Sequence, residues 1–133
     1  MKKYELMAFV LSPLVPVLLF FIGIIVWQID TVDKHGYGAL FSIAASLAAI
    51  GLIVSYSVEL LIAVPLYYIG LKANKVSKQF VYLSAMILGA LIIAFVWSLF
   101  GAHTLNDLLP ALAVGAILGI SAGFVFWRVI NNA

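Results

Sequence analysis

The stretch "LLPALAVGAILGISAGFVFWRVI", residues 108–130, contains a single charged side chain, Arg128, near its end. A membrane-spanning helix needs about 20 consecutive, mostly apolar residues, so this stretch is long enough to cross a bilayer. Three further apolar stretches lie at about 6–28, 38–70 and 79–100. The connections between them are short and leave no room for a domain outside the membrane.

The composition of the whole chain agrees with four spans. Of its 133 residues, 66% are hydrophobic and 9% are charged, whereas soluble domains have about 25% charged residues. So few charges cannot cover the surface of a soluble domain, and the apolar surface must face lipid. The sequence therefore predicts an all-α integral membrane protein, in which residues 1–133 form one compact bundle of four transmembrane helices.

The distribution of charges predicts the orientation of this bundle. Lys and Arg in short loops near the span ends mark the cytoplasmic side. The basic residues expected on one side are Lys2, Lys3, Lys72, Lys75, Lys78 and Arg128, whereas the opposite loops hold Asp30, Asp33, Lys34 and Asp107. Both termini are therefore expected in the cytoplasm, and the compact loops favour a multi-pass protein of a bacterial inner (plasma) membrane.

The second stretch is longer than a membrane requires. Its 33 residues, Gly38 to Gly70, would extend about 50 Å as a helix, against a hydrocarbon core of about 30 Å. Tilting alone does not absorb this excess. The helix must kink or break, at Pro65 or at the weaker point Gly51, or else it protrudes from the membrane around Gly38. Pro13 and Pro16 are expected to disturb the first span in the same way.

Small residues recur at every fourth position of the last span: Ala111, Gly115, Gly119 and Gly123. Residues four apart lie on one face of a helix, so these positions form a stripe almost free of side chains. Such stripes let two helices pack closely in lipid. Packing within one chain and a seam between copies both remain open, and the third span offers a matching pair in Ala85 and Gly89.

Glu59 is the one charge in the middle of a predicted span. It lies 13 residues before Lys72, or about 20 Å of helix, which places it near the centre of the bilayer. A carboxylate there is costly, so it is expected to face the interior of the bundle. Ser55 and Tyr56 lie within one helical turn and complete a predicted polar site. At a similar depth, Gly115 suggests that the carboxyl meets a backbone carbonyl in the stripe of small residues.

Residues typical of metal sites and active sites are scarce. The chain has no cysteine, which excludes disulfides and thiolate ligands. Asp30, Asp33 and His35, with His103 and Asp107 on the other outer loop, are the only conceivable cluster, and Asp107 is expected instead to cap the last helix. We therefore predict no metal, no cofactor, no nucleic-acid partner and no enzymatic activity.

Three functional classes are left open. The first is a binding or accessory protein that recognises another membrane protein or a second copy of itself within the bilayer, for example an immunity protein against a membrane-inserting toxin. The second is a small homo-oligomeric transporter or channel, coupled to protons or cations through Glu59. The third is a membrane enzyme that acts on lipid headgroups, which would need chemistry from the Asp and His residues of the outer loops. In its size and its single membrane glutamate the chain is similar to the small multidrug resistance transporters, although their glutamate belongs to the first helix and this one to the second.

Overall fold

The computed structural model describes residues 2–29, 32–99, 101 and 104–132, and in this part of the chain all regular secondary structure is helical. The elements are α1 (Lys3–Leu11), α2 (Leu14–Trp27), α3 (Val32–Val58), the π-helix η2 (Glu59–Ala63), α4 (Val64–Lys72), α5 (Lys78–Leu99) and α6 (Leu105–Asn131). Together they form four helices that are long and apolar enough to cross a membrane: Lys3–Trp27, Gly36–Lys72, Lys78–Leu99 and Leu105–Asn131.

The first of these helices is broken at Ser12 and Pro13, between α1 and α2. The N–H of Ser12 donates to the carbonyl of Ala8 and closes α1. Pro13 has no N–H to continue this pattern. Pro16 lies in the first turn of α2, where backbone N–H groups have no acceptor within the helix, so its missing N–H removes no helical hydrogen bond.

The long second helix is irregular one turn before its proline. It passes Gly51 as a regular α-helix and widens into η2, where the N–H of Val64 donates to the carbonyl of Glu59, five residues back. Pro65 follows directly and cannot donate to Leu61, so the turn before it is free to adopt the wider hydrogen-bonding pattern. A second departure from helical geometry lies at Gly36, which has a φ of 76°.

The last helix begins earlier than the sequence pattern suggested. Its N-cap is Thr104, whose hydroxyl oxygen accepts a hydrogen bond from the N–H of Asp107 and whose O–H donates to the Asp107 carboxylate. The expectation that Asp107 caps a helix starting at Leu108 was therefore wrong. The Thr-x-x-Asp spacing is a capping signal, and it places Asp107 inside the first turn.

The stripe of small residues on α6 packs against the backbone of α5. A Cβ atom at Gly119 would collide with the carbonyl oxygen of Ala85, and one at Gly115 with that of Gly89. The contact is within one chain, between two helices joined by a short connection. The hypothesis that Glu59 meets a backbone carbonyl in this stripe was wrong, because Gly115 and Gly119 lie against the backbone of α5 and the carboxyl of Glu59 is bonded to Ser12 instead.

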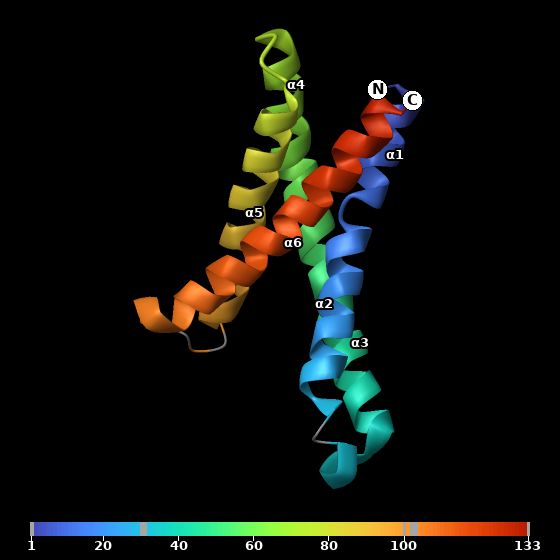
Figure 1. Ribbon diagram of the computed structural model, residues 1–133, viewed down its shortest axis with the longest axis vertical. Helices are drawn as coiled ribbons and strands as arrows, with labels where there is room; N and C mark the ends of the chain where they lie inside the picture. Colours follow the sequence, from blue (N-terminus) through green and yellow to red (C-terminus); the bar gives the residue numbers. More distant parts are fainter. Residues whose placement is uncertain (1, 30–31, 100, 102–103, 133) are drawn as a thin grey trace.

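The four helices do not surround a common axis as a compact bundle would. Figure 1 shows α5 with α6 as one arm and α2 with α3 as another, and the arms diverge towards the end of the molecule that lies away from α1. The two chain ends lie side by side at the opposite end of the molecule, near α1 (Figure 1).

Aromatic rings join three helices at the end that carries the termini. The ring centroids of Phe9 and Tyr67 are 5.6 Å apart, those of Phe9 and Phe126 are 4.8 Å apart, and those of Tyr67 and Phe126 are 5.3 Å apart. These residues come from α1, α4 and α6, and all three are buried. The arms are therefore held together at this end.

Candidate functional site

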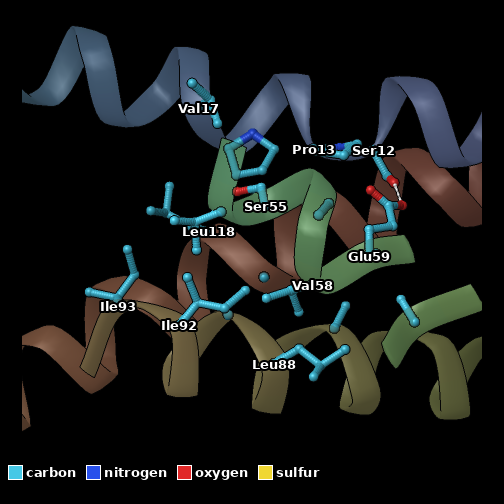
Figure 2. A pocket seen from close by; sticks show the side chains of 18 of the residues that line it. Ser12, Pro13, Val17, Ser55, Val58, Glu59, Leu88, Ile92, Ile93 and Leu118 are labelled. Atoms are coloured by element: carbon cyan, nitrogen blue, oxygen red, sulfur yellow. Dashed lines mark hydrogen bonds between the residues drawn. The ribbon is translucent and has the colours of Figure 1, made fainter. Parts of the chain in front are cut away.

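Glu59 is held by a residue of the first helix. The hydroxyl of Ser12 donates to Glu59 Oε1 over 2.5 Å, and Ser12 itself is buried (Figure 2). Both residues lie at irregular backbone, since Ser12 separates α1 from α2 and Glu59 is the first residue of η2. The break in the first helix thus places a hydroxyl group opposite the only carboxylate in the middle of the second.

Tyr56 also bridges these two helices, but through the backbone. Its hydroxyl donates to the carbonyl oxygen of Val10 over 2.7 Å. Val10 lies in the last turn of α1, where carbonyl groups have no intrahelical partner. Tyr56 therefore satisfies an acceptor that the break at Pro13 leaves open.

The structure does not bring the three residues of the predicted polar site, Glu59, Ser55 and Tyr56, to one place. Glu59 and Ser55 line the same cavity, shown in Figure 2, whereas Tyr56 is bonded to α1. Ser12 was missed in the sequence, although it directly precedes Pro13 in "SPLVP". A polar side chain next to a helix-breaking proline was the available signal.

The cavity occupies the space between the two arms and has a volume of about 520 Å³. We call it the cleft. Its walls come from every one of the four membrane-length helices, for example Val17 on α2, Val54 on α3, Leu88 on α5 and Leu118 on α6. Among the described residues, Glu59 is the only charged side chain that lines it, and its other polar groups are the hydroxyls of Ser12, Ser55, Ser84 and Tyr67 and the indole N–H of Trp97.

The cleft has the size and the character of a binding site. Ligand pockets of about 300–1,000 Å³ typically combine apolar walls with a few polar groups that orient the occupant. Here the polar group is a carboxyl whose only hydrogen-bond partner in the described part of the chain is Ser12. The arrangement suits an apolar occupant that carries one hydrogen-bonding or cationic group.

The outer-loop cluster cannot be placed beside this site. Asp30 and His103, with the side chains of Asp33 and His35, lie outside the described residues. In the part of the chain that the structure does describe, no three His, Asp or Glu side chains come together as metal ligands would.

Comparison with known proteins gives no relative from which a function could be taken. No family model matches the chain, and neither the curated proteins nor the solved structures contain a significantly similar one.

Proposed function

We propose that this chain is a multi-pass protein of the bacterial inner membrane, with both termini in the cytoplasm, that acts as a binding or accessory protein within the bilayer. Its partner is a transmembrane helix of another membrane protein, which packs along the cleft and places side chains in it. The observation that carries this proposal is the apolar cleft between the arms, to which all four membrane-length helices contribute. One example of such a partner is a membrane-inserting toxin, which this chain would block as an immunity protein.

The extent of the cleft favours a helix as its occupant. Cleft-lining residues recur along α5 from Phe80 to Trp97, or about 25 Å of helix. This length approaches the hydrocarbon thickness of about 30 Å that a partner helix must cross. In lipid, the association of two apolar helix surfaces gains little free energy from the hydrophobic effect, so close packing and hydrogen bonds hold helices together. Glu59 offers a hydrogen-bonding group on the wall of the cleft.

Site-specific photo-crosslinking tests this proposal. A photoreactive amino acid is placed at Leu88 or Val54 in the cleft, and for comparison at Leu83 or Ile53, whose side chains are 57% and 68% exposed. We expect the cleft positions alone to form an adduct with one protein, and mass spectrometry should map the adduct to a transmembrane segment. An adduct with a second copy of this chain, or equal labelling from all four positions, would contradict the proposal.

A matched pair of variants then tests the purified complex. Leu88→Trp fills the cleft, whereas Leu83→Trp makes the same change on the exposed face of α5. We expect Leu88→Trp to weaken binding of the identified partner at least about ten-fold, equivalent to about 1.4 kcal/mol. Leu83→Trp should leave binding unchanged, and equal losses in both variants would rule out the cleft as the binding site.

A second function, a proton- or cation-coupled transporter, is favoured by one observation. Ser12 and Glu59 meet where two membrane-length helices are both discontinuous, and discontinuous helices are typical of ion sites in transporters. Proton or cation flux into liposomes, measured for the wild type and Glu59→Gln, tests this function. Loss of flux in Glu59→Gln but not in Glu5→Gln, which changes a carboxyl outside the cleft, would establish the transporter and overturn the accessory role.

A further inference from the structure

A second, smaller pocket lies between the ends of α5 and α6 that are near the chain termini. Its volume is about 190 Å³, and none of its lining residues lines the cleft. Lys78 and Tyr82 line it from α5, and Trp127 and Arg128 from α6. We call it the basic pocket.

The charges of the basic pocket favour an anion. It is lined by two cations, Lys78 and Arg128, and by the amides of Asn131 and Asn132, and among the residues that the structure describes no carboxylate side chain lines it. The ammonium group of Lys78 lies 5.7 Å from the centroid of the Tyr82 ring. Guanidinium, ammonium and amide groups together offer several hydrogen-bond donors to one oxygen-rich anion.

The surroundings of the basic pocket favour an anion that carries acyl chains. Tyr82 and Trp127 are the residue types that gather at the membrane–water interface. Phe124, which is 53% exposed, also lines the pocket. Ile120 and Ile117 lie four and seven residues before Phe124 on the same face of α6, and they are 39% and 65% exposed. An exposed apolar strip therefore leads from the pocket along the helix towards the middle of the span.

We infer that the basic pocket binds the phosphate group of an anionic glycerophospholipid, whose acyl chains lie along Phe124, Ile120 and Ile117. Basic pockets between transmembrane helices are a recognised way to hold such headgroups. The phosphate meets Arg128 and Lys78, and the glycerol backbone lies beside the interfacial aromatic rings. A soluble phosphate compound would use the same cations but would gain nothing from the apolar strip.

Native mass spectrometry of the full chain in a neutral detergent tests this inference. Phosphatidylglycerol and phosphatidylcholine with the same acyl chains are added at equal concentration, and the retained lipid is counted. We expect the wild type to retain phosphatidylglycerol at least about ten-fold better, and the double variant Lys78→Gln/Arg128→Gln to retain the two lipids within about two-fold. Each single variant should lose part of the preference, which gives a second readout if the double variant does not fold.

The matched control is Lys72→Gln/Lys75→Gln, which removes two cations near the same end of the molecule but outside the pocket. It should keep the preference for phosphatidylglycerol. An equal loss of the preference in this control would show that the lipid responds to the overall positive charge of this end of the molecule, and it would overturn the assignment of the basic pocket as the site. Displacement of the lipid by an equal concentration of glycerol 3-phosphate would identify a soluble phosphate as the ligand and overturn the lipid assignment.

Discussion

At the scale of single residues, Glu59 depends on a hydroxyl that is far away in the sequence. Ser12 lies 47 positions before it and donates to its carboxyl group. Glu59 is partly buried, and a carboxyl that is removed from water without a hydrogen-bond partner is costly. The Ser12 hydroxyl therefore both satisfies Glu59 and ties the second helix to the break in the first.

A double-mutant cycle measures this contact. Ser12→Ala, Glu59→Ala and the double variant are unfolded in mixed micelles, and the coupling free energy is expected to be about 0.5–1.5 kcal/mol, the range of hydrogen bonds between membrane helices. The control is Ser121→Ala, because the Ser121 hydroxyl donates to Leu118 in its own helix. Coupling between Ser12 and Glu59 no larger than that between Ser121 and Glu59 would show that the hydrogen bond does not form.

Glycine at position 119 is required by close backbone contact. A Cβ there would collide with the carbonyl of Ala85, whereas a Cβ at Gly23 meets no atom within 4 Å. Gly119→Ala should therefore lower the free energy of unfolding by about 1–3 kcal/mol, as overpacking does. Gly23→Ala should raise it by up to about 1 kcal/mol, because alanine favours the helix. The prediction fails if both variants unfold at the same denaturant concentration.

At the scale of helices, an aromatic cluster joins three of them at the end that carries the termini. Phe9, Tyr67 and Phe126 bring α1, α4 and α6 together there. Away from this cluster, α2 and α3 follow one arm while α5 and α6 follow the other (Figure 1). The aromatic cluster, together with the packing of α2 against α6, holds the two arms on either side of the cleft.

Truncating one ring of this cluster should loosen three helices at once. Phe9→Ala removes ring contacts with both partners and should cost about 1–3 kcal/mol, less than a phenylalanine in a water-soluble core because lipid also solvates apolar groups. Phe95→Ala changes a ring that is 63% exposed and should have almost no effect. Unfolding in mixed micelles compares the two variants, and similar losses would assign no special role to the cluster.

At the scale of the whole molecule, the two chain ends lie close together (Figure 1). An even number of crossings returns the chain to the side on which it started. The basic residues near these ends then predict that this side is the cytoplasm. Lipid contact with the basic pocket would follow on that same side.

The absence of cysteine from the sequence makes this topology directly testable. Single cysteines are introduced at Ala73 and Asn132, expected in the cytoplasm, and at Asn106, expected outside; all three positions are exposed. In intact spheroplasts, a membrane-impermeant maleimide should label only the cysteine at position 106, and permeabilisation should allow labelling at all three. The reverse pattern would invert the orientation, and equal labelling at 106 and 132 would show that α6 does not cross.

Much of the fold could be predicted because it depends on local properties. The apolar stretches were close to the observed helices, and the disturbance at Pro13 follows from a missing N–H group. The candidate site was harder. Glu59 stood out as a charge in an apolar run, but its partner Ser12 is far away in the chain, and no local spacing predicts which helix will supply it.

The helical fold, with four helices long enough to span a membrane, can be read from the sequence, because length, apolar character and proline chemistry act within one segment. The packing of α5 on the stripe of small residues, and the divergence of the arms around a cleft with Glu59 on its wall, become visible in the folded molecule alone. These features depend on contacts between distant segments, and their physical basis is the fit of one helix surface to another rather than the preference of any single segment.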